Sequence, residues 1–189
     1  MTIIPLLVLA VIAVGMLWVI VKYNGLVTLR NQVQNGWKQI DVQLKRRHDL
    51  IPNLVNTVKG IMEFEQETLQ KVIQARSAAM SARGAADAAA KEGALSDALS
   101  KFFVVVEQYP QLRSSENVRQ LQEELTSTEN KISFARQFYN DIATQFNIAQ
   151  QVFPSNIIAA TFHFRLAELF EITVEAEREV PQVNLSLKR

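Results

Sequence analysis

The sequence predicts an all-α protein, with an N-terminal single transmembrane helix followed by an elongated antiparallel bundle of about four helices. Three observations support this fold class. An uncharged run of 19 residues extends from Ile3 to Val21, which is enough for a helix to cross the hydrocarbon core of a bilayer, about 30 Å thick. Beyond it, apolar residues recur at helical spacing. Proline and glycine, with 5 and 6 copies, are scarcer than in a sheet protein with many turns.

The first 22 residues form the expected transmembrane helix. Residues 1–5, MTIIP, lack the basic residues of a secretory signal peptide, so we expect an uncleaved anchor. Aromatic and basic side chains suited to the membrane interface gather at its far end, namely Trp18, Lys22, Tyr23 and Arg30. Because this positive flank is C-terminal to the run, we expect the N-terminus outside and the rest of the chain in the cytoplasm.

Basic residues are concentrated in the stretch that follows the run. Residues 22–59 hold seven lysines and arginines against two aspartates, whereas residues 60–189 hold 13 basic and 17 acidic residues. This distribution fits either an ordinary solvated helix face or attraction to an anionic lipid surface. Lys45, Arg46 and Arg47 are the candidates for contact with lipid or a partner. Nucleic acid is not expected as a partner, because no aromatic residues alternate with these charges in a binding pattern.

From Leu26 onward the spacing predicts long amphipathic helices. Two apolar rows with a 3.5-residue period begin there. Three of their members are candidate packing or oligomer positions: Trp37, Ile40 and Leu44. The rows keep their phase across Pro52, so we expect a kinked helix that continues to about Ala82.

Residues 83–94 are small and polar and contain two glycines, so we expect a loop or a frayed helix there. A short helix over residues 95–108 should follow, with Leu99, Phe102, Phe103 and Val106 buried. Tyr109-Pro110 should end it, after which Ser114, Ser115 or Asn117 can cap the next helix.

The helix expected over residues 118–149 has the cleanest apolar period in the chain, with steps that alternate between three and four residues. Such a row predicts packing against another helix along its length, with Leu125, Ile132 and Tyr139 as candidate positions. The spacing leaves open whether that helix belongs to the same chain or, as in a coiled coil, to another copy. An aromatic-rich helix over residues 157–172 should follow Phe153-Pro154. Residues 23–180 would then be one cytoplasmic helical-bundle domain, followed by a flexible tail over residues 181–189.

No catalytic, cofactor-binding or metal-binding residues can be assigned. The chain has no cysteine and two histidines, and it lacks a phosphate-binding glycine loop and a nucleophile elbow. We expect His48 at the surface or in a cap, and His163 in a core or an interface. Carboxylate metal sites in helical bundles use Glu-x-x-His pairs, but Lys45 and Ala160 stand three positions before the histidines. We therefore expect no metal, no cofactor and no enzymatic activity.

Several blocks of the sequence together resemble one family. The longest runs from Ile40 to Val55, IDVQLKRRHDLIPNLV. Others are Tyr23-Asn24-Gly25, Leu121-Gln122-x-x-Leu125-x-x-Thr128-Glu129-Asn130 and Ala135-Arg136-x-x-Tyr139-Asn140. In order and spacing these blocks resemble the LemA family over almost the whole chain, apart from residues 84–94 and the tail past Glu171. The resemblance implies a small bacterial membrane protein with its N-terminus outside, a cytoplasmic antiparallel helical bundle and no established enzymatic activity.

Two hypotheses of function follow. The first is a non-catalytic, membrane-anchored scaffold that self-associates at the cell inner membrane, with the lipid bilayer, further copies of itself and other membrane proteins as partners. The alternative is a membrane-remodelling or anionic-lipid-binding module, in which the basic stretch binds headgroups. Only the four residues 22–25 separate Val21 from the amphipathic pattern at Leu26. A glycine among them costs about 1 kcal/mol in a helix, so the span can be the first part of one long helix.

Overall fold

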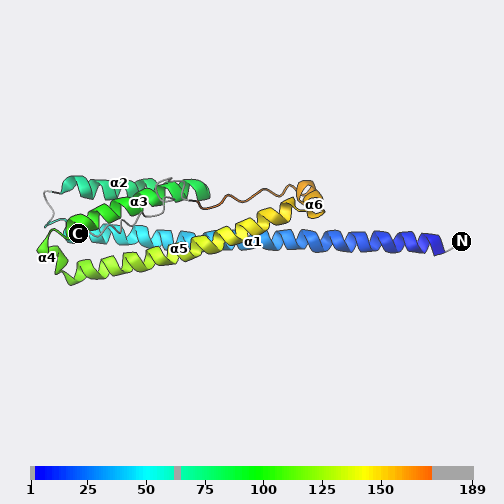
Figure 1. The fold of residues 1–189 in the computed structure, drawn as a ribbon, viewed down its shortest axis with the longest axis horizontal. Coiled ribbons are helices and arrows are strands. Elements are labelled where there is room, and N and C mark those ends of the chain that lie inside the picture. Colours follow the sequence, from blue (N-terminus) through cyan, green and yellow to red (C-terminus); the bar gives the residue numbers. More distant parts are fainter. Residues whose placement is uncertain (1–2, 62–64, 172–189) are drawn as a thin grey trace, which may run out of the picture. The chain divides into compact units, whose positions relative to one another are not determined.

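The structure, a computed structural model, describes residues 3–61 and 65–171. Within these residues the secondary structure is six α-helices and no strand (Figure 1): α1 (Ile3–Val58), α2 (Gln66–Met80), α3 (Gly84–Val106), α4 (Pro110–Arg113), α5 (Glu116–Gln151) and α6 (Ser155–Thr161). The all-α fold class with a long apolar N-terminal helix is confirmed. The described residues fall into two units, 3–57 with 115–169, and 58–61 with 65–114 and 170–171. The tail expected over residues 181–189 lies outside the described residues.

In the first unit, the apolar run and the amphipathic region that follows it form one uninterrupted helix. α1 has 56 residues, so it is about 84 Å long at 1.5 Å per residue. Gly25 lies inside α1, with open space where a Cβ would be. The segment expected to span the membrane therefore continues directly into the helix that builds the unit, and Figure 1 shows it extending past α5 and α6.

The C-terminal end of α1 differs from the sequence prediction. The helix continues past Pro52, as expected, but it ends at Val58 and does not reach Ala82. A turn follows, in which the Ile61 amide donates a 3.0 Å hydrogen bond to the Val58 carbonyl. Gly60 lies in this turn, and a glycine costs about 1 kcal/mol in a helix interior. This cost accounts for a helix end at a point where the apolar period itself continues.

α1 and α5 pack antiparallel in the first unit, as expected for the bundle. Arg46 forms an ion pair with Glu124, and ten residues earlier Gly36 faces Tyr139, so residue numbers fall along α1 as they rise along α5. A Cβ on Gly36 would lie 3.4 Å from the Tyr139 Cα. The absence of a side chain there lets the two backbones approach closely, which brings the apolar rows of both helices into contact.

The apolar row of α5 is buried along most of its length. Seven of its ten predicted members are buried, namely Val118, Leu125, Thr128, Ile132, Tyr139, Ile142 and Phe146. The other three, Leu121, Ala135 and Ala149, are half-buried. Ser115 occupies the N-cap position without a side-chain capping bond.

The helix expected over residues 157–172 is much shorter in the structure, because α6 ends at Thr161. His163 has a φ of 55°, a left-handed conformation in which His is found more often than most residues. The Phe164 amide bonds the Ala159 carbonyl at 3.0 Å, and the His163 amide bonds the Ala160 carbonyl at 3.2 Å. This is a Schellman motif, which ends a helix by satisfying its last carbonyls. His163 is therefore an exposed helix-terminating residue. Of the two positions expected for it, the core is wrong, and the interface stays a prediction.

The second unit contains α2, α3 and α4, with α2 packed against α3. Of the two alternatives expected over residues 83–94, a loop or a frayed helix, the loop is wrong, since α3 begins at Gly84, which has a φ of 80°. Alanine has the highest helix propensity, and this stretch is rich in it. The Asp87 carboxylate supports the first turn by accepting hydrogen bonds from the Arg83 amide at 2.8 Å and the Lys91 ammonium at 2.9 Å. The predicted end of α3 before Tyr109-Pro110 is confirmed.

Candidate interaction sites

The N-terminal part of α1 is an exposed apolar rod. Within the described residues α1 alone is long and apolar enough to cross a membrane, judged by length and composition, and none of its apolar window is buried. Large side chains such as Ile3, Leu9 and Val11 are 68–71% exposed. A long, contiguous and exposed apolar surface marks a site of contact with lipid or protein. Trp18 is half-buried and Lys22 is exposed near its C-terminal end.

Two of the residues expected at the membrane interface pack against the segment that follows α6. The ring of Tyr23 lies 4.7 Å from that of Phe162 and 5.9 Å from that of Phe164, between centroids. The Arg30 guanidinium lies 5.4 Å from the centroid of the Phe164 ring, close enough for a cation–π contact. Tyr23 and Arg30 thus hold the end of the α5–α6 hairpin at the level where the apolar run ends.

The basic cluster of α1 does not act as one surface. Lys45 and Arg46 are exposed, and Arg46 pairs with Glu124. Arg47 is 3% exposed, and its guanidinium lies 2.8 Å from the Glu129 carboxylate. His48 is 8% exposed, so the expectation of a surface or capping histidine is wrong. Arg47 stands at a position of the apolar row that begins at Leu26, which explains why it is turned into the packed side of α1.

The six candidate packing positions lie on the packed sides of α1 and α5. Five are buried, with exposures of 0–7%: Ile40, Leu44, Leu125, Ile132 and Tyr139. Trp37 is half-buried, and its ring meets that of Tyr139 edge-on with centroids 5.6 Å apart. The sequence left open whether these rows pack within one chain or between copies. At Trp37 and Tyr139 they pack within one chain.

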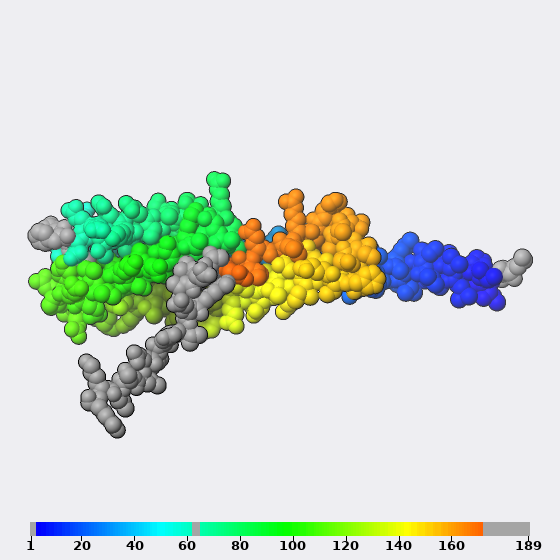
Figure 2. Space-filling view, turned by 45° about the horizontal axis from the view of Figure 1, so that its top comes forward, coloured from blue at the N-terminus to red at the C-terminus, as the bar shows by residue number. Residues whose placement is uncertain are grey.

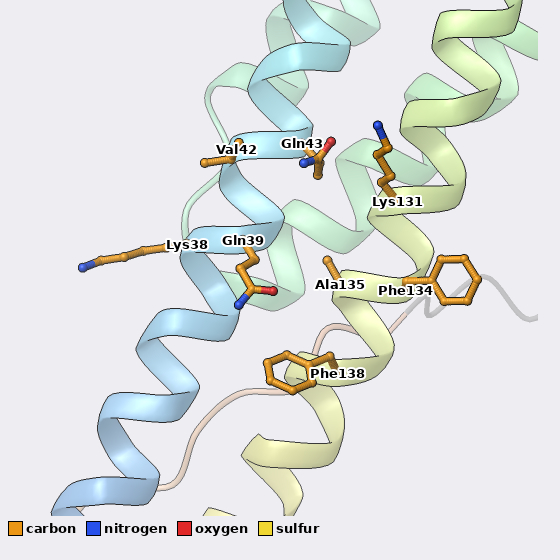
Figure 3. A pocket seen from close by; sticks show the side chains of 8 residues that line it. All are labelled: Lys38, Gln39, Val42, Gln43, Lys131, Phe134, Ala135 and Phe138. Carbon is orange, nitrogen blue, oxygen red and sulfur yellow. The ribbon is translucent and has the colours of Figure 1, made fainter.

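A different surface of the same two helices is open. It is an elongated hollow between α1 and α5, which we call the α1–α5 groove, with a volume of about 600 Å³ (Figure 3). The groove is lined by Lys38, Gln39, Val42, Gln43, Lys131, Phe134, Ala135 and Phe138. Three large apolar side chains remain exposed around it: Val42 by 61%, Phe134 by 73% and Phe138 by 47%. Figure 3 shows Gln39 and Gln43 reaching from α1 into the space between the helices.

The floor of the α1–α5 groove contains an unsatisfied polar atom. Gln43 Oε1 is buried and has no hydrogen-bond donor within the described residues. A buried acceptor without a donor costs free energy. The groove therefore combines exposed aromatic rings with a buried polar atom that the described residues leave unsatisfied. Its aromatic residues were missed from sequence, although Phe134 and Phe138 are four residues apart and thus share one helix face.

A non-helical segment with residues 167–168, which we call the strap, is hydrogen-bonded to side chains of α5. The Asn147 amide group brackets Ala167, donating to its carbonyl at 2.9 Å and accepting from its amide at 2.8 Å. The Tyr139 hydroxyl donates to the Glu168 carbonyl at 2.7 Å. Burial raises the pKa of the Tyr139 phenol, and the negative charge of Glu168 adds to this. Two side chains of α5 thus hold residues 167–168 in place of the helix that was expected there.

Over residues 3–61 and 65–171, no three His, Asp or Glu side chains are placed so that they could hold a metal ion. The carboxylates of Glu124 and Glu129 pair with Arg46 and Arg47, and that of Glu123 pairs with Arg119.

A sequence profile described as the LemA family matches residues 36–185. The chain belongs to the LemA family. The match includes residues 84–94 and most of the segment past Glu171, both of which the resemblance had left out. Family membership and the N-terminal apolar helix together fit a membrane-anchored helical protein.

The chain is also similar to three curated proteins described here. Protein LemA of Metamycoplasma hominis is 27% identical over 168 residues, which cover 87% of this chain and 73% of the relative. Magnetosome protein MamQ 2 of Paramagnetospirillum magneticum is 26% identical over 178 residues, and magnetosome protein MamQ of Magnetospirillum gryphiswaldense is 23% identical over 177 residues. This LemA-family chain matches 65% of the length of either MamQ protein.

Proposed function

We propose that this LemA-family protein is a non-catalytic scaffold of the cell inner membrane, anchored by the N-terminal part of α1, whose cytoplasmic helices self-associate through the α1–α5 groove. The observation that carries the proposal is the exposed pair Phe134 and Phe138 beside the buried, donor-free Gln43 Oε1. A second copy that brings apolar side chains to this groove covers the rings.

The membrane anchor makes such a contact easier to form. Copies held in one plane meet at a higher effective concentration than copies free in solution, so a modest groove can support assembly. A symmetric pair would place the same groove of each copy against the other, which is the commonest arrangement in homo-oligomers. The names of the MamQ relatives refer to magnetosomes. A scaffold role at a membrane is compatible with these names.

The test is the oligomeric state of the full-length protein in detergent micelles, measured by mass photometry. We expect oligomers of the native chain and a shift to monomers when Phe134→Asp and Phe138→Asp are combined. Val104→Asp is the matched control, because Val104 of α3 is also a large apolar side chain, exposed by 64%, but lies outside the groove. A native chain that is monomeric at all concentrations, or a double variant that assembles like the native chain, would overturn the proposal.

The orientation of the anchor has a separate test. The chain has no cysteine, so Thr2→Cys and Ser186→Cys each introduce a unique thiol. With the N-terminus outside, a maleimide that does not cross membranes should label Thr2→Cys in intact spheroplasts and Ser186→Cys only after lysis. The opposite labelling pattern would reverse the orientation.

The alternative, an anionic-lipid-binding module, has weaker support at the basic cluster. Arg46 and Arg47 are paired with glutamates of α5. Lys45 is 23 residues past Lys22 on one continuous helix, so an upright α1 places it about 35 Å from the membrane end of the span. That is several times the screening length of about 8 Å at physiological salt.

A further inference from the structure

The end of the first unit carries an apolar surface that neither the anchor nor the α1–α5 groove includes. We call it the α5–α6 corner. Its members come from the last turns of α5, from the link to α6, and from α6 with its C-cap: Ile148, Val152, Phe153, Ile157 and Phe162. All five are large apolar side chains with exposures between 48% and 80%. The opposite side of α6, with Ile158 and Ala159, is buried at 4%, so the helix already packs through its other face.

The position of the α5–α6 corner relative to α1 is fixed by an aromatic contact. The Phe162 and Tyr23 ring centroids are 4.7 Å apart, and Tyr23 comes two residues after the last member of the uncharged run, Val21. Figure 2 shows α6 (orange) beside the point at which the N-terminal part of α1 (blue) leaves the rest of the unit. If α1 spans a bilayer with residues 3–21, the corner therefore lies at the depth of the membrane surface.

The composition of this region suits that depth. Residues 142–164 contain no Asp, Glu, Lys or Arg, so no side chain with a fixed charge has to be desolvated on approach to lipid. Exposed charges flank it, with Asp141 directly before the uncharged stretch, Arg165 directly after it and Lys22 nearby on α1. Aromatic rings bordered by basic residues are the usual composition of protein surface at a membrane interface.

We propose that the α5–α6 corner is a second membrane contact, which inserts Phe153 and Ile157 into the boundary between lipid headgroups and acyl chains beside the span. The bilayer is then bound at two places on one unit, a spanning helix and an interfacial wedge. Amphipathic helices that lie in the membrane interface bury their apolar face by several ångströms at the headgroup boundary. The proposal concerns lipid, and it does not depend on self-association through the α1–α5 groove.

The test measures the depth of single side chains in the full-length protein in nanodiscs of phosphatidylcholine with phosphatidylglycerol. Because the native chain has no cysteine, Phe153→Cys and Ile157→Cys can each carry one environment-sensitive fluorophore. The control is Phe134→Cys, an exposed ring position of α5 in the groove. We expect blue-shifted emission at 153 and 157, and quenching by lipids with a nitroxide near the headgroup that is several-fold stronger than at 134.

Equal quenching at the three positions, or emission at 153 and 157 like that of a label in water, would overturn the proposal. A blue shift without quenching by the nitroxide lipids would also overturn it, since it would mean that protein covers the corner. The two labelled positions guard against local damage by one substitution, and circular dichroism of each variant checks that its helix content is that of the native chain. Failure here leaves the mass-photometry result on the groove variants unaffected.

Discussion

The Arg47 guanidinium lies 2.8 Å from the Glu129 carboxylate, and it joins the packed side of α1 to α5 while only 3% exposed. One residue earlier, Arg46 pairs with Glu124, but there both side chains are about half exposed, at 47% and 49%. Two neighbouring arginines thus make the same kind of ion pair in two different environments.

This contrast predicts unequal costs for removing the two glutamate charges. Glu129→Gln removes a charged partner of a buried guanidinium, so we expect a loss of about 1–3 kcal/mol in the free energy of unfolding. Glu124→Gln affects a solvated pair and should cost less than about 1 kcal/mol. Urea unfolding of the full-length protein in micelles, followed by circular dichroism, compares the two. Equal costs would mean that burial of Arg47 does not strengthen its pair.

Gly36 and Gly25 provide a second matched pair on α1. A Cβ at Gly36 would touch the Tyr139 backbone, whereas one at Gly25 would meet open space. Gly36→Leu should therefore push α5 away and lower the unfolding temperature by several degrees, as overpacking by about 1–3 kcal/mol does. Gly25→Leu should keep or raise it, because glycine is a poor helix former. Thermal melts in micelles test both variants, and equal tolerance at the two sites would contradict the close approach of the helices.

The strap on α5 should open when its amide bracket is removed. Asn147→Ala deletes both hydrogen bonds to Ala167, so we expect faster trypsin cleavage after Arg165, two residues away. Asn156→Ala, at an exposed position of α6, is the control and should be cleaved at the native rate. Mass spectrometry of the time course identifies the cut. Native-rate cleavage of Asn147→Ala would show that other contacts hold the strap.

The raised pKa of Tyr139 predicts a loss of stability in alkali. Burial and Glu168 favour the neutral phenol in the fold, so the folded-state pKa exceeds the unfolded value of about 10. The contribution is therefore complete below about pH 10 and is lost as pH rises through the folded-state pKa. We expect the melting temperature to fall more steeply above about pH 10 in the native chain than in Tyr139→Phe. Parallel profiles of the two proteins would rule out this role for Tyr139.

Sequence predicted the fold class, the apolar run and the long row on α5, because each depends on periodic patterns that span many residues. The sequence-based prediction failed where one local interaction decides whether the backbone starts, continues or ends a helix. Gly60 ends α1 although the apolar period continues, and alanines with Asp87 make a helix of a stretch in which two glycines suggested a loop. His163 takes up a left-handed conformation usually associated with glycine, which no periodicity indicates.

The candidate sites were predicted less well than the fold. Apolar residues on the main rows were found, but these rows are used for packing, and the exposed surfaces lie between them. Phe134 and Phe138 form a short second row on α5 that a search for spacing of four would have detected. The fates of Arg46 and Arg47 could not be separated, since adjacent residues on a helix face different directions and only the partner helix shows which one is enclosed.

Because α1 is continuous through Gly25, a change in the tilt of its N-terminal part also moves its C-terminal end. The helix from Lys22 to Val58 is about 54 Å long, so a change of 10° in the tilt of the span moves its far end by roughly 9 Å. Tilt responds to the thickness of the surrounding bilayer, since a span that is too long for a thin membrane leans over. If residues 3–21 span a bilayer, a local change in lipid thickness is thereby converted into a sideways displacement of the far end of α1.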